Sequence, residues 1–103
     1  MEVKDQIQKT ISENKVVIYM KGNKDFPQCG FSGATIRVLK EVGADFVDID
    51  VLQNPAIRQG IKDFSDWPTI PQVYVGGEFI GGCDIVVQMH QKGELKKVIE
   101  EAK

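Results

Sequence analysis

Residues 16–42 read VVIYMKGNKDFPQCGFSGATIRVLKEV, and this stretch decides the fold. Its first part, Val16–Met20, is rich in β-branched apolar residues, which is typical of a buried central strand. A polar loop with glycine and proline follows. Apolar side chains then recur at helical spacing from Ala34 to Val42, and Gly43 favours a helix end there. We therefore expect a strand, a loop and a helix, with Cys29 where the loop meets the helix.

The sequence on either side extends this unit. Apolar residues four positions apart predict an amphipathic helix over residues 3–14. Beyond the central stretch, Phe46–Val51 alternates aspartate with apolar residues, which indicates a strand near an edge. Asn54 and Pro55 then supply the cap and the first turn of a third helix. The N-terminal half is therefore expected to alternate helices with strands.

Glycine pairs divide the C-terminal half. Gly76-Gly77 separates two short strands, which predicts a hairpin. Gly81-Gly82 turns the chain into a helix over about 83–91, and Gly93 ends it before a last helix. The expected class is α/β, in the order helix, strand, helix, strand, helix, strand, strand, helix, helix. A helix joins the first two strands, so they should be parallel through a right-handed crossover. We expect a thioredoxin-like, four-stranded mixed sheet flanked by helices.

Composition limits the function classes. The 103 residues suit a single domain over 1–103. Net charge is −2 without a basic stripe, so we expect no nucleic-acid partner. The longest apolar run is far too short to span a bilayer, so we expect no membrane partner. Residues 1–5 contain no apolar signal-peptide region, so we expect a cytoplasmic protein. The alternative is an organellar matrix, reached by a transit peptide that was removed.

The chain has two cysteines, Cys29 and Cys83, too few for a four-cysteine metal site. The positive end of a helix dipole and its free N–H groups favour a thiolate at Cys29. Lys21, at the end of the preceding strand, should add positive potential, unless it is a plain surface lysine. Ser32 stands where a dithiol motif has its second cysteine. A mixed disulfide on Cys29 would therefore need an external thiol, or Cys83, to resolve it.

Several blocks of sequence together resemble the monothiol glutaredoxin family of the CGFS type. The resemblance extends from about Ile7 to Leu95, and residues 23–28 resemble the longer loop of that family. The blocks are Lys21-Gly22, Pro27, Cys29-Gly30-Phe31-Ser32, Trp67-Pro68-Thr69, Pro71 and Gly81-Gly82-Cys83-Asp84.

The resemblance implies a glutathione site on particular residues. Ile70, before a cis Pro71, would pair its backbone with the glutathione cysteine. The N–H groups around Cys83 would bind the γ-glutamyl carboxylate, and Asp84 the α-ammonium. Arg58 would meet the glycine carboxylate, which an arginine fork matches. Lys21 is the remaining residue expected to bind glutathione.

Without the resemblance, these residues have plainer explanations. Pro71 would be a trans proline at a strand edge. Asp84 would be a helix N-cap, and Arg58 would be a surface charge like Lys62 on the same helix. Trp67 would lie either at the site entrance or in the core. Other residues have similar alternatives: Phe31 covers a cluster or caps a helix, and His90 is surface or core filler.

A [2Fe–2S] cluster needs four thiolate-type ligands. Cys29, the expected catalytic residue and metal ligand, would supply one per chain, and glutathione a second. Two chains and two glutathiones complete the set around a two-fold axis. The resemblance implies cluster assembly, carriage and transfer to apo-proteins by this homodimer, or pairing with a BolA-like partner. The alternative is a glutathione-dependent thiol oxidoreductase, at most a weak enzyme. A third possibility is a regulatory module that senses through the cluster.

Overall fold

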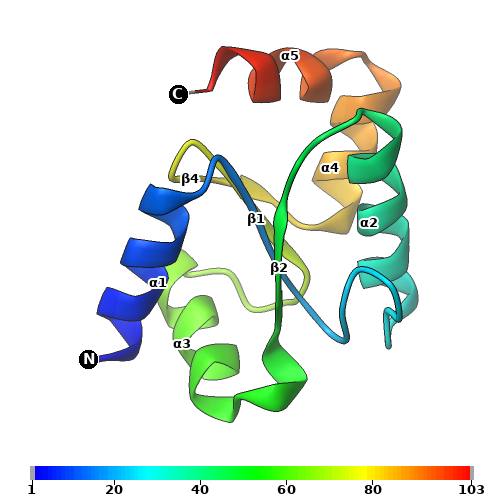
Figure 1. Cartoon of the computed structure of the whole chain (residues 1–103). Coiled ribbons are helices and arrows are strands. Elements are labelled where there is room, and N and C mark those ends of the chain that lie inside the picture. The colour runs from blue at the N-terminus through cyan, green and yellow to red at the C-terminus, as the bar shows by residue number, and fades with distance from the viewer. Residues whose placement is uncertain (1, 103) are drawn as a thin grey trace.

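The strand, loop and helix expected around Cys29 form the centre of the fold. A computed structural model describes residues 2–102 (Figure 1). Strand β1 spans Val16–Met20 and is buried throughout, and helix α2 spans Gly30–Glu41. The other elements are α1 (Val3–Glu13), β2 (Val47–Asp50), η1 (Val51–Gln53), α3 (Pro55–Ser65), β3 (Gln72–Val75), β4 (Glu78–Gly81), α4 (Cys83–Gln91) and α5 (Glu94–Glu101).

The four strands form one mixed sheet in the order β2-β1-β3-β4. β1 pairs in parallel with β2, so that Val17 lies opposite Val47. It pairs antiparallel with β3, which in turn forms the antiparallel hairpin with β4. The parallel pair, the hairpin and the edge position of β2 confirm the predicted thioredoxin-like arrangement.

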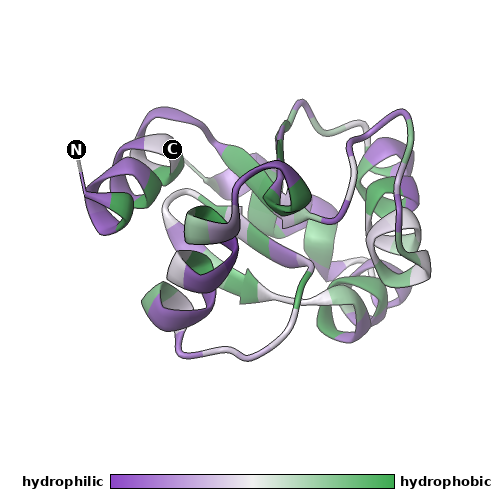
Figure 2. Ribbon diagram, turned by 90° about the horizontal axis from the view of Figure 1, so that it is seen from below, coloured by the Kyte–Doolittle hydropathy of each residue, from purple (hydrophilic) through white to green (hydrophobic). Residues whose placement is uncertain are grey.

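Helices cover both faces of the sheet. Successive residues of β1 alternate between two hydrophobic clusters, because neighbouring side chains in a strand point to opposite faces. Ile18 packs in the cluster that includes α2, α4 and α5, whereas Tyr19 packs in the one that includes α1 and α3. Figure 1 shows α1 and α3 on one side of the sheet and α2 and α4 on the other. In Figure 2 the hydrophobic colour follows the central strands and one side of several helices.

The structure differs from the sequence-based expectation at the end of β2. The strand predicted over 46–51 stops at Asp50, and the short 3-10 helix η1 follows. The carboxylate of Asp50 accepts a hydrogen bond from the Leu52 N–H at 2.9 Å, which caps η1 and turns the chain out of the sheet. By contrast, α3 begins as predicted, because Asn54 accepts bonds from the N–H groups of Ala56 and Ile57.

His90 makes a contact that its sequence context did not predict. Its Nε2 lies 2.9 Å from Oε2 of Glu41, and this contact joins the last turns of α4 and α2.

None of the helices within residues 2–102 is long and apolar enough to cross a membrane.

Candidate functional site

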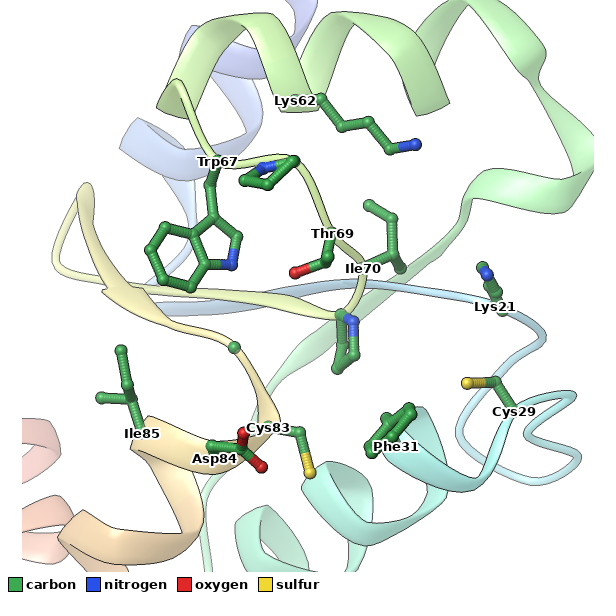
Figure 3. A pocket seen from close by; sticks show the side chains of 13 residues that line it. Lys21, Cys29, Phe31, Lys62, Trp67, Thr69, Ile70, Cys83, Asp84 and Ile85 are labelled. Atoms are coloured by element: carbon green, nitrogen blue, oxygen red, sulfur yellow. The ribbon is translucent and has the colours of Figure 1, made fainter.

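A cavity of about 490 Å³ opens beside Cys29, at the edge where β1, α2, α3 and α4 meet (Figure 3). Two segments face each other across it. We call Lys21, Cys29 and Phe31 the cysteine wall, and Trp67–Pro71 the proline wall. The remaining lining residues are Lys62 from α3 and Gly82, Cys83, Asp84 and Ile85 at the start of α4.

Most of the site residues expected from the sequence lie together at this cavity. Its lining contains Cys29, Lys21, Ile70, Cys83 and Asp84. Arg58 is not part of the lining, and Lys62, one helical turn later on α3, is. Contact of Arg58 with a ligand therefore stays a prediction, while Lys62 supplies the cation of α3 that faces the cavity. Figure 3 shows the amino groups of both lining lysines and the Cys29 sulfur around the same space.

Cys29 is the N-cap residue of α2 and is half-buried. Its pKa is lowered first by the backbone N–H of Ser32 and then by that of Phe31, whereas burial opposes the shift. The charge of Lys21 and the Ser32 hydroxyl lower the pKa further. These are the effects expected at the positive end of a helix, where free N–H groups stabilise an anion. Cys29 is therefore placed to react as a thiolate.

The loop before Cys29 is anchored to β2, a connection that the sequence analysis missed. Gly22 donates its N–H to Oδ1 of Asp50 at 3.0 Å, and Lys24 donates its N–H to Oδ2 of Asp48 at 2.8 Å. Gly22 has φ +87°, and an added Cβ would lie 2.5 Å from the carbonyl oxygen of Phe26. The alternating aspartates that indicated an edge strand thus also fix the loop of the cysteine wall.

The proline wall contains the cis peptide bond that the resemblance implied, between Ile70 and Pro71. Trp67 lines the cavity, as one of its two expected positions had it, and its ring lies 5.7 Å from that of Phe79. Among residues 2–102, its Nε1 is the one buried side-chain nitrogen or oxygen without a hydrogen-bond partner. The wall is therefore a short irregular segment packed on the hairpin.

The start of α4 forms the third side of the cavity. Its N-cap is Gly82, not Asp84, so the alternative of Asp84 as a plain N-cap is wrong. Asp84 lies in the first turn, with its carboxylate exposed at the cavity. A Cβ on Gly82 would lie 3.1 Å from the Pro71 carbonyl, which explains the close approach of α4 to the proline wall. Cys83, like Cys29, is a free thiol.

A second, more open hollow lies on the other side of Cys29. It has a volume of about 700 Å³ and runs between α2 and α4. Cys29, Phe31, Cys83 and Asp84 line both hollows, and the ring of Phe31 is 62% exposed. Within residues 2–102 no group of three or more His, Cys, Asp or Glu side chains is arranged to hold a metal.

Comparisons with known proteins agree on the family. The sequence model of the glutaredoxin family matches residues 16–80. Monothiol glutaredoxin-5, a mitochondrial protein of Saccharomyces cerevisiae, is 50% identical over 98% of this chain and 69% of its own length. Glutaredoxin 4 of Escherichia coli is 46% identical over 94% of this chain and 84% of its own length. The chain also matches the chloroplastic monothiol glutaredoxin-S14 of Arabidopsis thaliana at 46% identity over 98% of its residues, but spans only 58% of that relative.

Solved structures show the same fold. Reduced poplar apo GrxS14 superimposes with a TM-score of 0.85 at 47% identity, covering 96% of this chain and 91% of that one. A buckwheat glutaredoxin–glutathione complex has a TM-score of 0.85 at 26% identity, covering 96% and 88%. The family match, the identities and the single cysteine at the start of α2 lead to one conclusion: the chain belongs to the monothiol glutaredoxin family.

Proposed function

We propose that this glutaredoxin binds glutathione in the cavity beside Cys29. We further propose that two such chains together carry a [2Fe–2S] cluster and pass it to acceptor proteins. The observation that carries the proposal is the position of Cys29. Its half-buried, thiolate-favouring sulfur lies between a cavity of peptide size and a second open hollow.

The charges around the cavity suit glutathione, which has two carboxylates, one ammonium and one thiol. Lys21 and Lys62 supply cations near one end, suited to the glycine carboxylate. At the other end, the N–H groups at the start of α4 suit the γ-glutamyl carboxylate, and Asp84 suits the ammonium. Between these two ends, Ile70 would pair its backbone with the cysteine of glutathione. The glutathione complex of the buckwheat relative supports glutathione as the ligand.

The cluster is cargo that this chain holds jointly with glutathione and a second copy. Four thiolate-type ligands are needed, and each chain brings Cys29 and one bound glutathione. Cys83 lies at the same cavity but is not needed for that count. The open hollow and the exposed Phe31 ring leave room for a second chain to approach Cys29. A BolA-like protein in place of the second copy, and a cytoplasmic location, stay predictions.

Anaerobic reconstitution tests the proposal. The protein is incubated with iron and sulfide, with and without glutathione, and then examined by visible absorption and by sizing. We expect a coloured dimer only when glutathione is present, because each chain lacks the remaining sulfur ligands. A colourless monomer in both samples would contradict cluster carriage.

A second candidate function, removal of glutathione from protein mixed disulfides, is favoured by the lowered pKa of Cys29. The Cys29 thiolate would attack the glutathione sulfur, and the protein substrate would leave as its own thiolate. A second glutathione thiolate would then attack the Cys29–glutathione disulfide, releasing oxidised glutathione and regenerating the Cys29 thiolate. Turnover of a small glutathionylated peptide measures this route, and a rate at the uncatalysed background would exclude it.

A further inference from the structure

Gln72 is a fully buried polar residue directly after Pro71, and its side chain holds the proline wall from within the protein. Its Nε2 donates to the carbonyl oxygens of Trp67 and Thr69, both at 3.2 Å. Its Oε1 accepts from the hydroxyl of Tyr74 at 3.1 Å. Gln72 does not line the cavity, so it can affect a ligand only through the segment that it holds.

Chemistry determines the orientation of this amide. Backbone carbonyls only accept hydrogen bonds, so the –NH₂ group of Gln72 must face Trp67 and Thr69. Its carbonyl oxygen is then left for the one partner that can donate, the Tyr74 hydroxyl. Both N–H groups and the oxygen of the amide are thereby used, and a flipped amide would set carbonyl against carbonyl.

The Tyr74 hydroxyl, which donates to Gln72, stays protonated and stays in place. Burial raises the pKa of Tyr74 to about 12, so the hydroxyl keeps its proton at any physiological pH. The Tyr74 ring packs against Tyr19 and Phe79, with centroids 5.8 and 5.4 Å away. The hydroxyl is therefore held in place by aromatic packing on the α1–α3 face of the sheet.

The proline wall needs such support because it has little of its own. Pro68 and Pro71 carry no backbone N–H, and the segment lies outside the strands. Its first residue is held on both sides, since the Trp67 N–H donates to the Ser65 hydroxyl at 3.1 Å while its carbonyl binds Gln72. The next carbonyl held is that of Thr69, directly before Ile70.

We propose that Gln72 is a positioning residue for the thiol peptide that binds this cavity. By fixing the carbonyls of Trp67 and Thr69, it sets in advance the backbone of Ile70 that the ligand pairs with. The ligand then bears less of the cost of ordering this wall. This inference rests on the proposed binding of glutathione, and it assigns the specificity for an extended peptide to a residue that the ligand never touches.

The test compares Gln72→Met with the control Gln91→Met, a change at an exposed residue at the end of α4. Calorimetric titration with glutathione is done at a temperature where circular dichroism shows all proteins folded. We expect Gln72→Met to bind roughly tenfold more weakly, since the carbonyls of Trp67 and Thr69 lose the side-chain donor that fixes them. The control should match the wild type.

A second readout separates positioning from general damage. The rate at which iodoacetamide alkylates Cys29, followed against pH, reports on the cysteine wall alone. We expect the same profile in Gln72→Met and wild type. A profile that shifts together with the glutathione affinity would overturn the inference, because the whole site would then have been disturbed.

Tyr74→Phe provides a milder variant in case Gln72→Met does not fold. It keeps the ring and removes the hydroxyl, which donates to Gln72 and also interacts with Ser65, so we expect a smaller loss of glutathione affinity in the same direction. Unchanged affinity in both variants would overturn the role of Gln72 while leaving glutathione binding intact. A wild-type protein that binds no glutathione would instead contradict the proposed function and, with it, this inference.

Discussion

The two walls of the cavity are built in different ways. The cysteine wall consists of exposed and half-buried residues held by a helix N-terminus and by the loop that Asp48 and Asp50 anchor. The proline wall rests on buried groups, with Ile70 only 7% exposed and Gln72 fully buried. The Cys29 sulfur therefore lies on the wall that is open to partners, and the backbone proposed to pair with glutathione lies on the wall that is tied to the core.

Removing the sulfur from one wall is the strongest test of this division. We expect Cys29→Ser to abolish cluster binding and the mixed disulfide with glutathione, because it removes the one thiolate placed at the start of α2. Cys83→Ser, its matched control at the same cavity, should largely preserve both. Visible absorption after reconstitution and mass spectrometry after exposure to oxidised glutathione measure the two effects. Complete loss in Cys83→Ser would make Cys83 a ligand or an essential packing residue.

A glycine of the loop tests how rigidly the cysteine wall is set. Gly22→Ala should lower the free energy of unfolding by about 2–3 kcal/mol, because its positive φ and the approach of the Phe26 carbonyl leave no room for a Cβ. Gly30→Ala is the control, since a Cβ there meets no atom within 4 Å. Urea denaturation compares the two variants. Equal stabilities would mean that the loop relaxes at no cost and does not fix Lys21.

Much of the fold was predictable because its signals are local. The apolar run of β1, the Asn54–Pro55 start of α3 and the bounds of α4 all appear in the structure where the sequence placed them. Features that depend on distant partners were missed. The bond from Gly22 to Asp50 joins residues 28 apart, and His90 and Glu41 are 49 apart. No periodicity or turn signal contains information on such pairs.

The candidate site shows the same limit. Cys29 was identified from its place at a helix start, which is local. Arg58 and Lys62 lie one turn apart on the same face of α3, so which of them reaches the cavity depends on the position of each turn along the helix axis. The cavity lies beside the later turn, which carries Lys62. Gln72 was missed altogether because its role depends on carbonyl positions.

The smallest expected effect concerns the electrostatics of the cysteine wall. The backbone N–H of Ser32 is the leading cause of the lowered pKa of Cys29, and the charge of Lys21 is a lesser one. Lys21→Gln should therefore raise this pKa without restoring its ordinary value. The alkylation profile of Cys29 would move to higher pH, because more of the cysteine would be thiol at any given pH.

Salt provides the control for that last effect, together with Lys92→Gln at the far end of α4. Surface charges interact more weakly as ionic strength rises, so the difference between Lys21→Gln and wild type should shrink in about 1 M salt. The influence of the Ser32 N–H, a fixed contact within one helical turn, should persist there. An alkylation profile that Lys21→Gln leaves unmoved at low salt would show that the helix start alone activates Cys29, and that Lys21 serves only the ligand.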